Sequence, residues 1–135
     1  QILDIPFVLN ARINTHWYPL SDIDDRLNVA IDRGNACLAA GADCVFVPGI
    51  HGEKEIARLV REIDGPVNIL ASKSCPPVAR LQELGVARLS VGSGPARACL
   101  GLIARMIDEL RNSGTYASIN QDAIAYEEAN RLFTE

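Results

Sequence analysis

The stretch that decides the fold is Phe7-Val8-Leu9-Asn10-Ala11-Arg12, a continuous and mostly apolar run that ends in a charge. A run without in-and-out alternation predicts a fully buried parallel strand. In a β/α barrel the carboxyl ends of such strands build the active site. Arg12 falls at this end, and its planar donor fork suits a carboxylate ligand. A structural ion pair with a neighbouring acid is the alternative role for Arg12.

Three further runs of the same kind follow along the chain, so strands are expected at 6–12, 43–48, 66–71 and 87–92. Helical patterns separate and follow them. The first helix follows a capping box at Ser21 and Asp24 and stops at Gly41, and the second has Glu53 and Glu55 in its first turn. The third helix runs from Pro76 to Gly85 and the fourth from Pro95 to Gly114. The last helix spans about 121–133. The predicted fold class is therefore α/β, with four parallel βα units resembling half of a (β/α)8 TIM barrel, plus a C-terminal helix.

Two domains are expected: a half-barrel over 1–114, and a connector with the C-terminal helix over 115–135. The segment 112–118 is polar and contains Gly114, so it can let the last helix swing away to a partner. Because four strands cannot close a barrel, three arrangements stay open: the other units lie outside this sequence, two chains combine, or the sheet is open. The first residue, Gln1, is not methionine, which suggests an upstream portion.

Composition excludes several classes of protein. The 135 residues are 48% hydrophobic and 22% charged, which indicates a folded domain rather than disorder. The net charge of -4, without a basic cluster, argues against a nucleic-acid partner. No run is long enough for a membrane helix, and no signal peptide is visible. The four cysteines lack metal or redox spacing, so we expect buried, reduced thiols in a cytoplasmic protein: Cys37, Cys44, Cys75 and Cys99.

Polar residues at the other strand ends complete the candidate site. Asn68 lies inside a buried strand and must be hydrogen-bonded, either to substrate or to a neighbouring strand or loop. Gly92 and Ser93 form a turn before a helix start, where free N–H groups bind anions, although any tight βα turn uses such residues. His16 and His51 lack a carboxylate cluster at ligand spacing, so we expect solvent-exposed loop histidines and no metal site.

Taken in order, these pieces resemble the C-terminal half of the isocitrate lyase/phosphoenolpyruvate mutase superfamily. The segments that carry the resemblance are Phe7 to Arg12, Ala40 to Asp43 with Val45 to Gly49, Pro66 to Ala71, Leu84 to Gly92, and the tail Ala125 to Phe133. The resemblance implies a (β/α)8 barrel that makes or breaks C–C or P–C bonds in 2-oxo and hydroxy acids. It also implies that Arg12 binds the substrate carboxylate and that Asn68 faces the pocket.

The resemblance implies magnesium for the intact family member, whereas the acidic metal ligands and the mobile catalytic loop lie upstream of the matched region. One local departure is Ile13-Asn14 in place of the family's Thr-Asp. We therefore expect the substrate-binding half of a lyase or mutase, inactive alone, with a small carboxylate or oxo-acid ligand. The alternative is a non-catalytic half-barrel that oligomerises or binds a small anion. Relatives swap their terminal helix, so a homo-oligomer with helix exchange is also expected.

Overall fold

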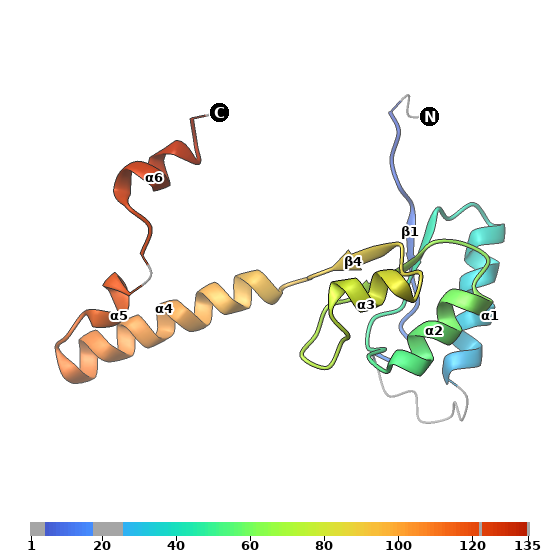
Figure 1. Cartoon of the computed structure of the whole chain (residues 1–135), viewed down its shortest axis with the longest axis horizontal. Coiled ribbons are helices and arrows are strands. Elements are labelled where there is room, and N and C mark those ends of the chain that lie inside the picture. Colours follow the sequence, from blue (N-terminus) through green and yellow to red (C-terminus); the bar gives the residue numbers. More distant parts are fainter. Residues whose placement is uncertain (1–4, 18–25, 122, 135) are drawn as a thin grey trace. The chain divides into compact units, whose positions relative to one another are not determined.

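The structure, a computed structural model, describes residues 5–17, 26–121 and 123–134. These residues form two compact units, 1–92 and 93–135, and each is described by itself. Figure 1 labels the elements along the chain. The domain boundary expected at residue 114 marks where the last helix would leave for exchange between copies. This boundary stays a prediction.

The first unit contains one four-stranded sheet whose strands are parallel and lie in sequence order. The strands are β1 (Asn10–Arg12), β2 (Cys44–Phe46), β3 (Val67–Leu70) and β4 (Arg88–Ser90). Each lies within its predicted range, and the parallel order confirms four βα units. Each is also shorter than predicted, because a residue counts as strand only where a neighbouring strand pairs with it.

The predicted burial of the opening run is wrong. Phe7, Val8 and Leu9 are exposed by 67%, 63% and 50%. They precede the first paired residue of β1, which lies at the edge of the sheet with β2 on one side and no described strand on the other. The apolar pattern thus marks a surface that the described residues leave uncovered.

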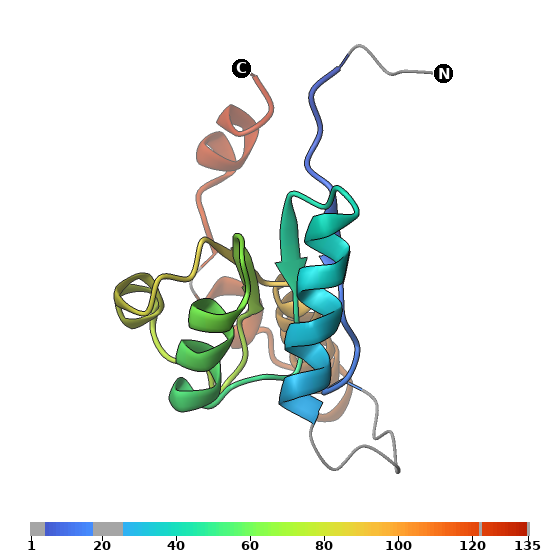
Figure 2. The same ribbon diagram turned by 90° about the vertical axis from the view of Figure 1, so that its right-hand side faces the viewer.

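Three helices cover one face of the sheet: α1 (Arg26–Ala39), α2 (Glu53–Glu62) and α3 (Val78–Glu83). Figure 2 shows α1 and α2 side by side in front of the strands. The start signals Ser21 and Asp24 lie outside the described residues, whereas Glu53 and Glu55 are in the first turn of α2 as predicted. There they complement the positive end of the helix dipole. α3 begins two residues later than predicted, with Pro77 as its N-cap.

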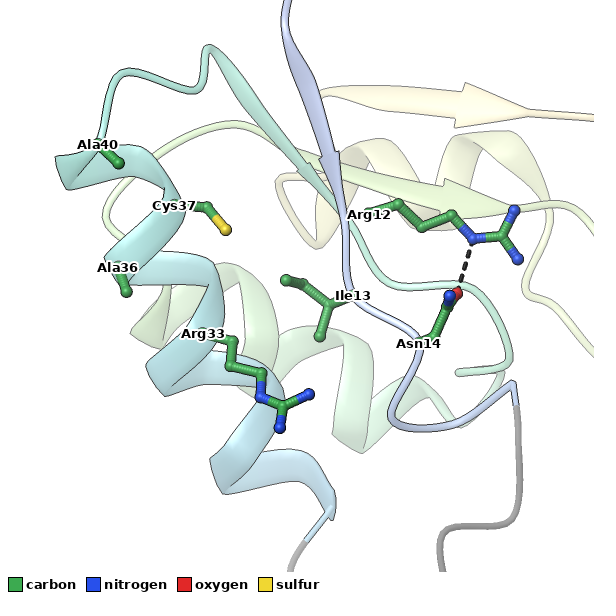
Figure 3. Close-up of a pocket in the computed structure, with 7 residues that line it drawn as sticks. All are labelled: Arg12, Ile13, Asn14, Arg33, Ala36, Cys37 and Ala40. Atoms are coloured by element: carbon green, nitrogen blue, oxygen red, sulfur yellow. Dashed lines mark hydrogen bonds between the residues drawn. The ribbon is translucent and has the colours of Figure 1, made fainter.

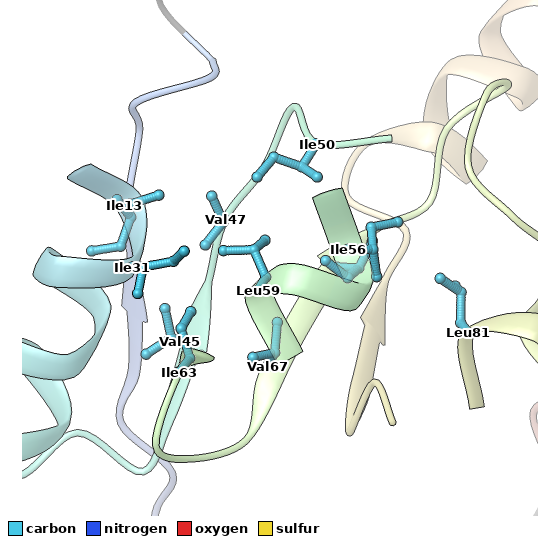
Figure 4. Close-up of a cluster of buried hydrophobic side chains, with 12 residues drawn as sticks. Ile13, Ile31, Val45, Val47, Ile50, Ile56, Leu59, Ile63, Val67 and Leu81 are labelled. Atoms are coloured by element: carbon cyan, nitrogen blue, oxygen red, sulfur yellow. The ribbon is translucent and has the colours of Figure 1, made fainter. Parts of the chain in front are cut away.

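The hydrophobic core lies between these helices and the sheet. It includes Val45, Val67 and Ile69 from the strands and Ile56 and Leu59 from α2 (Figure 4). These strand residues alternate with Phe46, Asn68 and Leu70, which therefore point to the other face of the sheet. We call that other face the inner face; it carries Asn10, Arg12, Cys44, Phe46, Asn68, Leu70, Arg88 and Ser90.

The second unit is helical: α4 (Gly94–Ser113), α5 (Ala117–Asn120) and α6 (Tyr126–Arg131). α4 has a proline in its first turn and ends at Gly114, whose φ of 66° is the left-handed conformation of a helix stop. The single helix predicted over 121–133 is wrong, because only 126–131 are helical and Gln121 and Ala125 are extended. Amphipathic spacing alone does not hold so short a helix, and no residue of α5 or α6 is buried.

The connector 112–118 is anchored to α4 by one carboxylate. Glu109 accepts hydrogen bonds from the Thr115 hydroxyl (2.6 Å), the backbone N–H groups of Ala117 and Ser118 (both 2.8 Å), and the Ser118 hydroxyl. These bonds lower the pKa of the Glu109 carboxyl to about 2, and the bond from the Ser118 hydroxyl contributes most. The corner between α4 and α5 is thus fixed, although its sequence is polar and contains Gly114.

Candidate functional site

Strand register brings Arg12 and Asn68 to the same level of the inner face. Arg12 pairs with Phe46 across β1 and β2, and Phe46 pairs with Asn68 across β2 and β3. Side chains at paired positions of parallel strands point to the same side of the sheet. Two strand spacings separate the backbones of Arg12 and Asn68, which is about 10 Å. A small ligand can therefore span both side chains.

The Arg12 guanidinium is held by three side chains. Its Nε donates to Asn14 Oδ1 over 2.7 Å, and its Cζ lies 5.6 Å from the Trp17 ring centroid and 5.8 Å from that of Phe46. These distances are within the range of cation–π attraction. Figure 3 shows Arg12 pointing away from α1 and toward Asn14. Asn14, part of the Ile13-Asn14 departure, thus makes a polar contact with the arginine.

No carboxylate in the described part of the chain forms an ion pair with Arg12. The described residues therefore give no support to the alternative of a structural ion pair. The side chain is exposed, and its fork is fixed in orientation by Nε and the two rings. Such an arrangement suits a carboxylate or phosphonate from outside the chain.

Asn68 is fully buried and is paired with Ser90. Its Nδ2 donates to Ser90 Oγ over 2.9 Å, and the same hydroxyl lies 3.1 Å from Oδ1, to which it can donate. The neighbouring-strand alternative for the Asn68 hydrogen bond is therefore observed. Contact of the amide with substrate stays a prediction.

The two histidines lie on adjacent strand-end loops and are half-buried, so the expectation of solvent-exposed side chains is wrong. His16 Nδ1 is 2.9 Å from Thr15 Oγ1, and His51 Nδ1 is 2.9 Å from Ser72 Oγ. Burial lowers the pKa of His16, with a smaller contribution from Arg26 and an opposing one from Glu55. The loops press together at Gly49, where a Cβ would lie 2.8 Å from the His16 carbonyl oxygen.

The Gly92–Ser93 turn joins the two units. Gly92 has a φ of 53°, and a Cβ there would meet Leu70 Cδ1 at 3.3 Å. Ser93 is the N-cap residue of α4, and its side chain makes no capping hydrogen bond. Anion binding at this turn stays a prediction.

A cavity of about 470 Å³ lies between β1 and α1 (Figure 3). Its lining residues are Arg12, Ile13, Asn14, Arg33, Ala36, Cys37 and Ala40. Arg12 lines this cavity, whereas Asn68 and Ser90 do not, so the cavity does not bring the two main candidates together.

The described residues do not fit a magnesium ion. They contain no group of three or more histidine, cysteine, aspartate and glutamate side chains that could hold a metal. The inner face offers amides, guanidinium groups, a thiol and a hydroxyl, whereas Mg²⁺ is held mainly by carboxylates and waters. We therefore derive no metal-assisted step from these residues. Within the described ranges, no helix has both the length and the apolar character needed to span a membrane.

The sequence did not reveal Trp17 and Phe46 beside Arg12, or Ser90 beside Asn68. The alternation of apolar and polar residues cannot pair one strand with another. The register supplies that pairing, and it depends on how the strands assemble.

Four parallel strands with polar side chains toward their carboxyl ends, covered by helices on one face, are the arrangement of half a β/α barrel. The phosphoenolpyruvate phosphomutase family model matches residues 1–111, and the chain belongs to this family. This confirms the superfamily resemblance.

Three relatives illustrate the match. A Mycobacterium tuberculosis protein without an assigned activity is 38% identical over 132 residues, which is 93% of this chain and 49% of that protein. The structure of a candidate lyase/mutase from Burkholderia cenocepacia is 36% identical with a TM-score of 0.85, covering 98% of this chain and 47% of the other. The 2,3-dimethylmalate lyase of Eubacterium barkeri is 24% identical over 95% of this chain and 47% of the enzyme. The chain thus spans about half the length of the curated relatives it matches.

Proposed function

We propose that this chain supplies the substrate-binding half of a magnesium-dependent lyase or mutase. The reaction makes or breaks a C–C or P–C bond in a 2-oxo or hydroxy acid. Family membership and the relatives described as lyases and mutases support this class of reaction. The observation that carries the proposal is Arg12, an oriented guanidinium at a strand end without an acidic partner among the described residues.

In this proposal the Arg12 fork binds the substrate carboxylate through two parallel N–H···O bonds. Asn68 lies two strands away on the same face and binds a second oxygen, while Ser90 holds its amide. Gly92 and Ser93 bind an anionic group at the start of α4. Magnesium belongs to the complete protein, and we assign no metal ligand to this chain.

Calorimetric titration with malonate, a small dicarboxylate, and pyruvate, a 2-oxo acid, tests the role of Arg12 in the intact protein. Arg12→Ala should weaken binding by about tenfold or more, because it removes a charge-assisted bidentate contact. Arg12→Lys, which keeps the charge but loses the fork, should fall between that variant and wild type. Arg61→Ala is the matched control, since Arg61 is an exposed arginine on α2.

Unchanged affinity in Arg12→Ala would make Arg12 structural. For the 135-residue chain alone we expect no turnover of oxaloacetate or phosphonopyruvate with magnesium. Turnover by this chain would contradict the assignment of the metal site to the other half. Ligand binding without turnover in the complete protein would favour the alternative, a non-catalytic barrel that binds a small anion.

We also propose a cytoplasmic homo-oligomer in which helices after β4 pack on a second copy. The four free cysteines support a reducing compartment, although the expectation that all four are buried is wrong, since Cys99 is exposed. Large apolar side chains of α4, including Leu100, Ile103 and Ile107, are 50–64% exposed and support packing on a partner. Light scattering of the full chain and of a variant ending at Asn120 tests exchange of α6. If exchange of α6 holds the oligomer together, the shorter variant is monomeric.

A further inference from the structure

The inner face carries two positive charges and no acid. Its eight side chains are those of alternate residues in four fully described strands, and they include Arg12 and Arg88 but no aspartate or glutamate. The opposite face is apolar and covered by helices. The inner face is therefore polar, and its charged side chains are all positive.

Arg88 lies in the same register row as Arg12. It is the first residue of β4, and strand pairing connects it to Arg12, the last residue of β1, through Asn68 and Phe46. Its register partner is Asn68, which puts it on the inner face. Burial raises the pKa of the Cys44 thiol on this face, and the charge of Arg88 partly offsets that rise.

Neither the charge of Arg88 nor the side-chain oxygen of Asn10 has a partner among the described residues. Arg88 takes part in none of the ion pairs found there. Asn10 Oδ1, also on the inner face, is buried and accepts no hydrogen bond from them. A buried polar atom of this kind is uncommon in a complete structure.

Closure of the barrel covers this face, so each charge on it then needs a partner of opposite charge. A guanidinium keeps its proton, so Arg88 enters the barrel interior as a cation. A buried cation is strongly unfavourable unless it is paired and hydrogen-bonded. A second copy of this chain would bring another Arg12 and another Arg88 and no inner-face acid.

We propose that the inner face docks only against an acidic counterface: the βα half that completes the barrel places a carboxylate against Arg88, and a second copy of this chain does not fill that place. The proposal concerns what closes the barrel and is independent of the reaction. It also separates the two surfaces of the molecule, because self-association uses the helices after β4 and not the inner face.

A charge-swap experiment on the full 135-residue chain tests this. Wild type and Arg88→Glu are labelled at the N-terminal amine with donor and acceptor dyes, and pairwise dissociation constants are measured by energy transfer. The mixed pair should associate about tenfold or more tightly than wild type with itself, because it replaces facing like charges by opposite ones. Self-association through the helices contributes equally to every pair.

Arg61→Glu is the matched control, since it makes the same charge change on the exposed surface of α2. It should leave association with wild type unchanged. A mixed Arg88→Glu pair no tighter than wild type with itself, or an equal gain with Arg61→Glu, overturns the proposal. Should Arg88→Glu fail to fold, Arg88→Gln removes the repulsion without adding an acid and should self-associate more tightly than wild type. No gain in that variant also overturns the proposal.

Discussion

The two units of this chain differ in what holds them together. The sheet unit buries side chains from all three of its helices and from β2 and β3, and Ile13, next to β1, joins the same core. In the second unit none of the described residues is buried, although α4 is the longest helix of the structure. The first unit is thus stabilised by its own core. The second keeps its helices through local signals and leaves apolar side chains of α4 exposed.

Core truncation tests this contrast with the largest expected effect. Leu59 is fully buried on α2, whereas Ile107 is 55% exposed on α4. Leu59→Ala should lower the free energy of unfolding by about 3 kcal/mol, because it leaves a cavity. Ile107→Ala should lower it by less than about 0.5 kcal/mol in the monomeric chain. Urea unfolding, followed by the fluorescence of the single tryptophan Trp17 and by circular dichroism, gives both values.

Equal losses for the two variants would contradict the contrast, since they would mean that Ile107 is buried in the monomer. Repeating the Ile107→Ala measurement at concentrations where the chain associates sharpens it. A loss that appears only there would show that a partner copy covers α4.

The second prediction concerns how closely the loops of the sheet unit fit together. Gly49 and Gly41 have positive φ angles of 92° and 103°, so alanine is strained at either position. At Gly49 a Cβ would also lie 2.8 Å and 2.9 Å from the His16 carbonyl oxygen and carbon, whereas nothing lies within 4 Å at Gly41. Gly49→Ala should therefore cost at least about 2 kcal/mol, and Gly41→Ala about 1 kcal/mol.

Urea unfolding of the two alanine variants isolates the steric term, because the backbone strain is common to both. Similar losses would indicate that the His16 loop moves aside at no cost. In that case the contact between the first two strand-end loops would be adaptable rather than fixed.

Local signals explain what could be predicted from the sequence. The order of four βα units, the acidic first turn of α2 and the helix stop at Gly114 depend on residues close together in the chain, and all are observed. The helix predicted over 121–133 failed because its apolar spacing had no described packing surface to hold it. Burial of Phe7 failed because Phe7 precedes the paired residues of β1, which is an edge strand of the described sheet.

The candidate site followed the same division. Strands could be located from the sequence, whereas the shared level of Arg12 and Asn68 on the inner face follows from strand register. The pairings of Asn68 with Ser90 and of Arg12 with Phe46 depend on strand register. The inner-face position of Arg88 depends on the register as well, and no local pattern contains that information.

The third prediction addresses the buried amide of the sheet unit. Ser90→Ala removes the hydroxyl that pairs with the fully buried Asn68, so it should cost about 1–2 kcal/mol for an unsatisfied polar group. Ser72→Ala is the control, because Ser72 is exposed and its partner His51 is only half-buried. The control should cost less than about 0.5 kcal/mol. Equal losses in the unfolding assay would mean that water replaces the Ser90 hydroxyl.

The smallest expected effect lies in the second unit, at the corner that Glu109 holds. The pKa of its carboxyl is about 2 in the folded chain, against an ordinary 4.5, because the ionised form accepts four hydrogen bonds. The depressed pKa means that the carboxylate stabilises the corner fully above pH 4.5 and loses this effect as the pH falls toward 2. Amide exchange at Ala117 and Ser118, expressed as protection factors, should therefore decline over this interval. In Glu109→Gln, which cannot titrate, the protection of the same amides should be lower at pH 4.5 and flat below it. A carboxyl shift in the nuclear magnetic resonance spectrum that titrates near 4.5 would show that the corner is open in solution, and that the second unit lacks even this local anchor.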